Sequence, residues 1–211
     1  MKEETLINTR QFVMHFHAND TSGHDWWHVN RVTQLALQIA IKEKADLFLV
    51  EMAALLHDID DWKLGDNGTS KTESFLDSTG LPPSEVTDIL TIISEVSFKG
   101  AGVDTPANTI ESQCVQDADR LDAIGAIGIA RAFTYGGSKN RSLYNPGVNP
   151  VLHGSFQDYK TNQSHTINHF YEKLLLLKDR MTTPSAKAIA QERHNFMERY
   201  LDQFFREWNL S

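Results

Sequence analysis

A histidine and an aspartate close an apolar helical run. The run Ala53-Ala54-Leu55-Leu56 leads directly into His57 and Asp58. Burying an imidazole beside a carboxylate costs about 1–3 kcal/mol or more unless each group has a partner. A metal ion is the strongest partner available to both groups. Any fold of this chain therefore has to bring further ligands to His57 and Asp58.

Apolar residues recur at helical spacing along most of the chain, and no stretch of useful length alternates as a strand would. We find no internal repeat, no low-complexity tract and no linker long enough to divide domains. The pattern predicts one all-α domain over residues 1–211. The expected helices cover residues 4–17, 24–44, 45–58, 70–76, 82–96, 107–133, 162–180 and 184–209.

Helix starts are indicated by capping signals. Ser22 with Asp25, and Ser70 with Glu73, have the spacing of a capping box. Thr105-Pro106 and Thr183-Pro184 each combine a capping residue with a first-turn proline. The histidines at the end of the first helix, His15 and His17, are expected on the surface, where the helix dipole favours them.

Composition narrows the class of protein. With 211 residues, 40% of them hydrophobic, the chain can bury a sizeable core without disulfides. The single Cys114 and the polar first residues favour a cytoplasmic protein without an export signal, and no stretch is long enough to span a membrane. A net charge of −8 argues against binding to a nucleic-acid backbone, but not against small phosphorylated ligands. A homodimer is compatible with the sequence.

Ligands for the doublet can come from two other helices. His28 lies on the apolar face of residues 24–44, near His24 and Arg31. A histidine on such a face is usually a core residue, but His57 and Asp58 at the end of the next helix make a ligand the better interpretation. Asp119 and Asp122 share one face of residues 107–133. Together, His28, His57, Asp58 and Asp119 form a nitrogen and oxygen set that suits Mn²⁺, Fe²⁺, Co²⁺, Ni²⁺ or Zn²⁺ and leaves positions open for water and substrate.

Two loops carry candidate phosphate contacts. Lys99 is followed by Gly100 and Gly102, so an ammonium and the backbone can approach a phosphate together, although such a segment is also an ordinary loop. Residues 136–154 form a long insertion that is either a binding lid or a surface loop. Within it, Lys139, Arg141 and Tyr144 suit phosphate and base contacts. Asp60 and Asp61, two and three residues after Asp58, are either solvated loop residues or catalytic.

The chain resembles the HD-domain superfamily of metal-dependent phosphohydrolases. The matching pieces occur in the family's order: His28 within residues 24–32, the doublet His57-Asp58, and Asp119 within residues 118–121. The resemblance implies an all-helical fold and hydrolysis of phosphate esters or anhydrides, often of nucleotides.

Residues 57–61, 97–100 and 117–125 are similar to a bacterial subgroup of small HD hydrolases. This similarity implies nucleoside triphosphate pyrophosphohydrolase activity with Mn²⁺. The Gly-Tyr-Pro segment of members that hydrolyse cyclic dinucleotides is missing, as are the extra histidines that build a two-metal site. We therefore expect a single ion.

The mechanism expected from this set uses metal-activated water. Asp58 is expected to take part in catalysis as a metal ligand, and Asp61 is the expected general base. Lys99, with Arg31, Lys139 or Arg141, would neutralise charge on the phosphate chain. Asp122 is expected to support the site or to contact a sugar hydroxyl.

Three other functions use similar residues. A nucleoside monophosphate phosphatase would use the same ion and release orthophosphate. An HD-type oxygenase would need a second iron and extra ligands. A non-catalytic nucleotide sensor would bind its ligand without turnover. The sequence leaves the base, the sugar and the native metal open.

Overall fold

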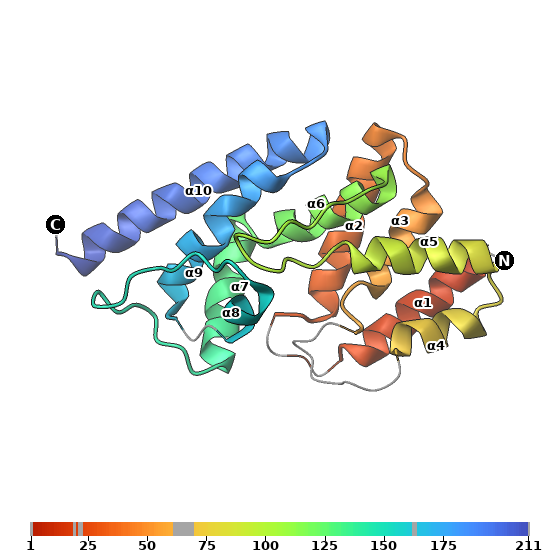
Figure 1. The fold of residues 1–211 in the computed structure, drawn as a ribbon, viewed down its shortest axis with the longest axis horizontal. Helices are drawn as coiled ribbons and strands as arrows, with labels where there is room; N and C mark the ends of the chain where they lie inside the picture. The colour runs from red at the N-terminus through yellow and green to blue at the C-terminus, as the bar shows by residue number, and fades with distance from the viewer. Residues whose placement is uncertain (1, 19, 21–22, 61–69, 162–163, 211) are drawn as a thin grey trace. The chain divides into compact units, whose positions relative to one another are not determined.

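The computed structural model describes residues 2–18, 20, 23–60, 70–161 and 164–210, and Figure 1 shows its ribbon. All regular structure in these ranges is helical, which confirms the all-α class. No helix in them has the length and apolar character needed to cross a membrane. The chain folds as two compact units, one of Met1–Ser97 with Thr105–Asp119 and the other of Phe98–Asp104 with Arg120–Ser211. The single domain expected for residues 1–211 stays a prediction.

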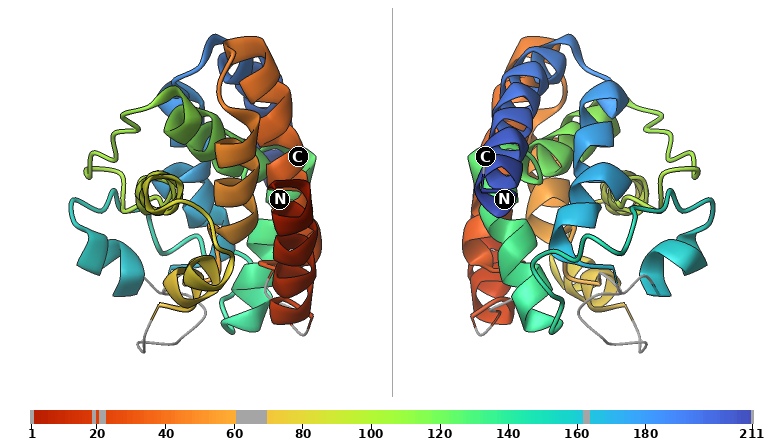
Figure 2. Two further views of the ribbon diagram at one scale, coloured as in Figure 1. Left: turned by 90° about the vertical axis from the view of Figure 1, so that its right-hand side faces the viewer. Right: turned by 90° about the vertical axis from the view of Figure 1, so that its left-hand side faces the viewer.

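The first unit is built around its most apolar helix, α3 (Leu47–Leu56). Helices α1 (Lys2–Phe16), α2 (Trp26–Glu43) and α5 (Pro83–Ser94) all pack against α3, and Figures 1 and 2 show α2 running beside it. A helix that is apolar on all sides has to be surrounded in this way. Helix α4 (Lys71–Ser78) packs on α5, and Phe75 stacks on Phe12 with ring centroids 4.3 Å apart.

Most helix starts in this unit carry a polar cap. Asp46 accepts hydrogen bonds from the amides of Phe48 and Leu49 at the start of α3. Ser70 Oγ accepts one from the amide of Glu73, so the predicted cap of α4 is confirmed. Each cap satisfies amide groups that the first helical turn leaves without partners.

The long helix expected over residues 107–133 is wrong at its start and in its middle. Helix α6 (Ile110–Asp122) begins four residues later than Pro106 would place it, with Thr109 Oγ1 accepting from the amide of Ser112. A second helix, α7 (Gly125–Ser138), follows after a break at which Gly125 has φ of +77°. Glycine tolerates this left-handed conformation, so the chain can turn there.

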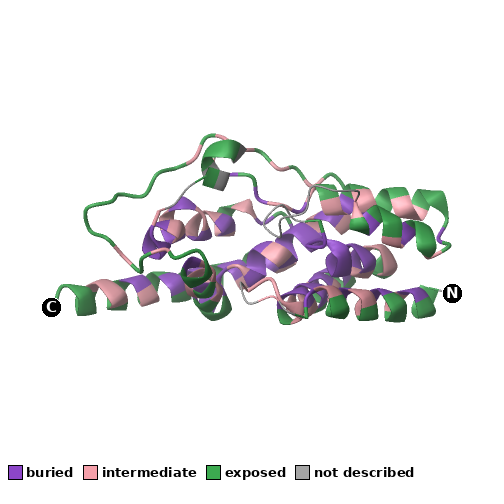
Figure 3. Ribbon diagram, turned by 90° about the horizontal axis from the view of Figure 1, so that it is seen from below, coloured by how far each residue is buried: buried purple, intermediate pink, exposed green. Residues whose placement is uncertain are grey.

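The second unit contains α7, α8 (Phe156–Thr161), α9 (Thr166–Glu172), the 3₁₀ helix η2 (Leu174–Arg180) and α10 (Pro184–Trp208). Helix α10 packs against α7 and η2, and its Thr183 cap is confirmed. Figure 3 shows buried positions along α10, and they recur every three or four residues as Ala186, Ala190, His194, Met197 and Leu201. The single helix expected over 162–180 is wrong, because the chain changes direction at Lys173 (φ −142°, ψ −61°). Helix α8 is not predicted by the sequence pattern.

Candidate metal centre

Asp25 positions His28 at the start of α2. Its backbone is extended and its carboxylate accepts a hydrogen bond from the amide of His28 over 2.9 Å. Asp25 is therefore the N-cap itself, which corrects the capping box expected with Ser22, a residue outside the described ranges. The cap fixes the first turn of α2 and places the fully buried His28 ring inside the first unit.

The end of α3 orients the second imidazole. His57 follows the last residue of α3, and its Nδ1 lies 2.8 Å from the carbonyl oxygen of Ala54. A carbonyl can only accept, so Nδ1 carries a proton and Nε2 is the ring nitrogen that can offer a lone pair. That Nε2 is buried and finds no hydrogen-bond partner among the described residues. A buried lone pair of this kind fits a metal ion.

Two carboxylates meet these imidazoles. Asp58 Oδ2 lies 3.1 Å from His28 Nε2, and Asp58 Oδ1 lies 3.5 Å from His57 Nε2. From α6, Asp119 Oδ1 approaches His28 Nε2 to 3.7 Å and His57 Nε2 to 3.8 Å. All four groups belong to the first unit. The structure thus brings together the four residues predicted from the sequence as ligands. They come from α2, from α6 and from the end of α3.

The surroundings keep Asp58 ionised. Burial alone raises the pKa of this carboxyl, but the neighbouring His57 and His24, with hydrogen bonds from His24 and His28, outweigh burial and hold the pKa well below its usual range. The side chain of Asp119 is 27% exposed, so one carboxylate of the set reaches solvent. Two imidazoles and two carboxylates form a donor set suited to a divalent transition metal.

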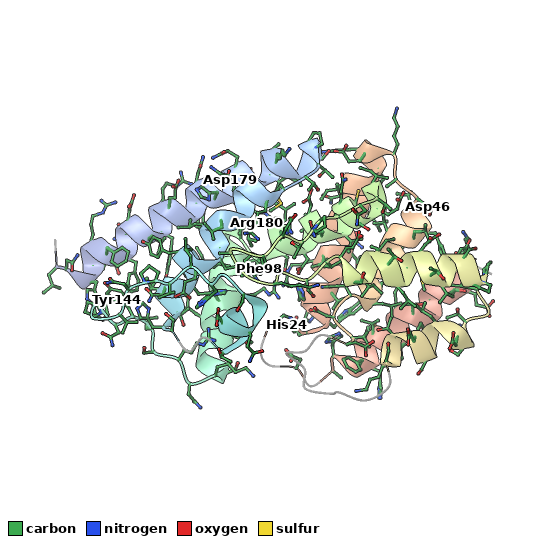
Figure 4. All side chains as sticks on the ribbon, in the orientation of Figure 1. His24, Asp46, Phe98, Tyr144, Asp179 and Arg180 are labelled. Atoms are coloured by element: carbon green, nitrogen blue, oxygen red, sulfur yellow. The ribbon has the colours of Figure 1, made fainter. Side chains whose placement is uncertain are left out.

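His24 also belongs to this cluster, although the expected ligand set omits it. Its Nδ1 lies 2.9 Å from Asp58 Oδ2, and Figure 4 labels it near the start of α2. There are two groups of three residues in which the potential ligand atoms all lie within 4.8 Å of one another. The first is His24, His28 and Asp58, and the second is His28, His57 and Asp119. The only sequence signal for His24 is its spacing of four residues from His28.

His17 is buried, which corrects the surface position expected for it, whereas His15 is exposed. The chain turns after α1 so that the His17 ring hydrogen-bonds the backbone of His24. Burial lowers the pKa of His17 more than this hydrogen bond and the nearby Asp58 raise it. His17 therefore adds a fourth imidazole, with a lowered pKa, next to His24, His28 and His57.

Asp60 has a structural role. Its carboxylate accepts hydrogen bonds from Ser70 Oγ and from the amides of Lys71 and Thr72, all at the start of α4. Asp61, the expected general base, lies outside the described residues. Arg31 is half-buried on α2, one turn after His28.

The other candidate contacts lie in the second unit. Asp122 is buried and forms an ion pair with Arg131 at 2.9 Å. Lys99 is exposed, in a loop whose carbonyls at Gly100 and Ala101 accept hydrogen bonds from Arg180. Figure 4 labels Arg180 near Phe98, over whose ring its guanidinium lies at 5.0 Å.

The insertion expected over residues 136–154 is shorter than predicted, because α7 continues to Ser138. Lys139 and Arg141 both lie over the ring of Tyr135, at 5.6 and 5.7 Å. The ring of Tyr144 packs edge-on against His165 and Trp208, with centroids 5.1 and 4.9 Å away. Tyr144 therefore takes part in aromatic packing.

The fold and the cluster define a class: an all-helical protein with a buried His and Asp centre of metal-binding type. Residues 26–124 match the model of the HD domain. The chain is 41% identical over 198 residues to YpgQ of Bacillus subtilis, covering 92% of this chain and 89% of YpgQ. An HD-superfamily hydrolase from Bacillus thuringiensis is 41% identical with a TM-score of 0.76 over the whole of both chains. The chain belongs to the HD-domain superfamily.

Two further crystal structures support this assignment. A protein from Lactobacillus plantarum is 38% identical with a TM-score of 0.91, over 99% of this chain and 98% of that protein. The crystal structure of Bacillus subtilis YpgQ in complex with ADP has a TM-score of 0.76 at 38% identity, over 96% of this chain and 97% of YpgQ. The family is therefore supported both by sequence and by structure.

Proposed function

We propose that this protein is a metal-dependent phosphohydrolase that acts on nucleotides, and that it releases pyrophosphate from nucleoside triphosphates. The observation that carries the proposal is the convergence of His28, His57, Asp58 and Asp119 on one buried cluster. The ADP bound to YpgQ, a relative with 38% identity over nearly the full chain, supports a nucleotide as the ligand.

The four residues would hold one divalent ion, for which we propose Mn²⁺. When bound, such an ion lowers the pKa of a coordinated water and polarises a phosphoryl oxygen. Two features of the chain suit such an ion: the Ala54 carbonyl holds Nδ1 of His57, which leaves Nε2 as the nitrogen available to the ion, and the pKa of the Asp58 carboxyl lies well below its usual range.

Other residues would handle the proton and the phosphate charge. We assign Asp61 as the general base, since it follows the doublet by three residues. Arg31, in the same unit as the four ligands, is the proposed phosphate contact. The roles of Lys99, Lys139 and Arg141 at the phosphate and of Tyr144 at the base stay predictions from the sequence. For Asp122 the buried ion pair with Arg131 favours a structural role over a sugar contact.

The test is a product assay on metal-free protein reloaded with Mn²⁺, Mg²⁺, Co²⁺ or Ni²⁺ and given the common nucleoside triphosphates. We expect pyrophosphate and a monophosphate, and we expect Asp58→Asn to lose both metal retention and turnover. The matched control is Asp88→Asn, an exposed aspartate on α5. Orthophosphate as the only inorganic product would instead indicate a phosphomonoesterase, and full metal-dependent activity in Asp58→Asn would place the site elsewhere.

A further inference from the structure

The shortest imidazole-to-carboxylate contact in the cluster involves His24. Its Nδ1 lies 2.9 Å from Asp58 Oδ2, whereas the distances from His28 and His57 to either aspartate run from 3.1 to 3.8 Å. Both side chains are almost fully buried, with 12% of His24 and 6% of Asp58 exposed. Water therefore competes little for this contact.

The direction of the hydrogen bond follows from the chemistry of the two groups. A carboxylate oxygen accepts, so in this 2.9 Å contact His24 Nδ1 is the donor. His28 Nε2 also faces Oδ2, at 3.1 Å, and would exchange that contact for the ion when it acts as a ligand. A protonated Nδ1 has no lone pair to give to a metal ion. His24 in this orientation is a hydrogen-bond donor to Asp58.

The geometry also separates His24 from the other ligands. Donor atoms that share one ion at about 2.0–2.2 Å lie within about 4.4 Å of one another. His24 shares a group within 4.8 Å with His28 and Asp58, whereas His57 and Asp119 belong to the other group. His24 is thus grouped with Asp58 and His28, and not with His57 and Asp119, so it adjoins the proposed site through Asp58.

Two contacts hold His24 in place independently of Asp58. Its backbone amide donates to Asp20 Oδ1 over 3.0 Å, and its backbone also hydrogen-bonds the buried ring of His17. The His24 ring packs edge-on against His28, with centroids 5.6 Å apart. The backbone and one edge of the ring are therefore held by contacts that do not involve Asp58.

We propose that His24 is a positioning residue for the metal ligand Asp58. The hydrogen bond to Oδ2 fixes the rotation of the carboxylate and leaves Oδ1, the atom that faces His57, to bind the ion. The inference rests on the metal site of the proposed function and extends it to a residue outside the four ligands. Residues that orient metal ligands typically change metal affinity by about 10–100-fold when they are replaced.

The test compares His24→Asn with His24→Leu. Asparagine can place an N–H donor near the position of Nδ1, whereas leucine fills space without a donor. Mn²⁺ affinity of the metal-free proteins is measured by competition with a chromophoric chelator, and folding is checked by circular dichroism and thermal unfolding in EDTA. His15→Leu, at an exposed histidine of α1, is the matched control.

We expect His24→Leu to bind Mn²⁺ about 10–100-fold more weakly, and His24→Asn to recover most of the affinity. The visible spectrum of the Co²⁺ form should be the same in His24→Asn and in the parent protein, because the ligand set does not change. If a folded His24→Leu protein binds Mn²⁺ as tightly as the parent protein, the proposed role of His24 is wrong and the metal site of the proposed function still stands. A Co²⁺ spectrum that loses a nitrogen ligand in His24→Asn would make His24 a ligand and also overturn the proposal. If the parent protein binds no Mn²⁺, the metal site of the proposed function falls, and the role of His24 falls with it.

Discussion

His57 Nδ1 lies 2.8 Å from the carbonyl oxygen of Ala54, one turn back at the end of α3. This contact selects the tautomer whose Nε2 lone pair faces Asp58 and Asp119. The helix end therefore does more than carry His57 to the cluster. It also prepares the nitrogen that would bind a metal ion.

The tautomer of His57 can be observed directly. In long-range ¹H–¹⁵N spectra of metal-free protein at neutral pH, we expect Nδ1 of His57 to be protonated and Nε2 to be unprotonated. Adding Zn²⁺, which is diamagnetic, should shift the Nε2 resonance and leave the Nδ1 proton in place. The exposed His15 should show averaged tautomers and serves as an internal control. A proton on Nε2 of His57 would contradict the assignment.

Asp60 should stabilise the start of α4 in a pH-dependent way. Partial burial raises the pKa of its carboxyl, but hydrogen bonds from Ser70, Thr72 and Lys71 outweigh it and lower the pKa below the ordinary value. A lowered pKa adds stability that is present above the unfolded-state pKa and is lost as the pH falls through the folded-state pKa. We expect Asp60→Asn to lower the free energy of unfolding by about 1 kcal/mol at pH 7, because hydrogen bonds to an ionised carboxylate are stronger than those to a neutral amide.

The measurement is urea unfolding of metal-free protein at several pH values. The difference in free energy of unfolding between Asp60→Asn and the parent protein should shrink as the pH falls below about 4. Asp77→Asn, at an exposed position in α4, should change the stability little at any pH. A difference that stays constant down to pH 2 would show that the carboxylate charge plays no part.

Features set by neighbouring residues were predictable from the sequence. The caps at Ser70 and Thr183 need only a side chain and the amide two or three residues later, and both are present. The break before α7 was not predictable, because it depends on a distant contact: a Cβ on Gly125 would lie 3.0 Å from the side chain of Arg193 in α10. The burial of His17 likewise depends on the path of the chain after α1.

The same distinction between local and distant contacts applies to the candidate site. The four candidate ligands were predictable because their positions along apolar helices already imply burial. The partners that orient them were not, since the contact between His24 and Asp58 joins residues 34 positions apart. Asp122 is the opposite case, because its spacing from Asp119 suggested a site, whereas the structure gives it Arg131 as a partner.

The ion pair of Asp122 and Arg131 should act on stability. The side chain of Asp122 is 2% exposed and that of Arg131 is 17% exposed. Removing the carboxylate therefore takes a negatively charged partner away from a largely buried guanidinium. We expect Asp122→Ala to lower the free energy of unfolding by about 3 kcal/mol. The double variant Asp122→Ala with Arg131→Met should recover part of that loss.

Unfolding measurements and steady-state kinetics distinguish a structural role of Asp122 from a contact with the sugar of the nucleotide. A structural Asp122 predicts reduced stability with a coupling energy between the two positions, measured in a double-mutant cycle. Unchanged stability with a raised KM for the nucleotide would instead restore the sugar contact expected from the sequence.

Two adjacent glycines in the last turn of α7 should respond in opposite ways to the same substitution. A Cβ on Gly136 would lie 2.2 Å from Thr166 Oγ1, whereas a Cβ on Gly137 would meet nothing within 4 Å. Thr166 is buried, so its hydroxyl has little room to move. We expect Gly136→Ala to destabilise the protein by about 1–3 kcal/mol. Gly137→Ala should be neutral, or stabilise it by up to about 1 kcal/mol through the loss of backbone freedom in the unfolded chain.

The hydroxyl of Thr166 can be tested as the cause. Combining Gly136→Ala with Thr166→Ala removes the clashing atom, and the pair should be more stable than the sum of the two single changes predicts. Combining it with Thr166→Ser keeps the oxygen and should give no such recovery. Thermal and urea unfolding of the six variants, four single and two double, provide the comparison. Equal stability of Gly136→Ala and Gly137→Ala would show that α7 and α9 can separate at this contact without cost.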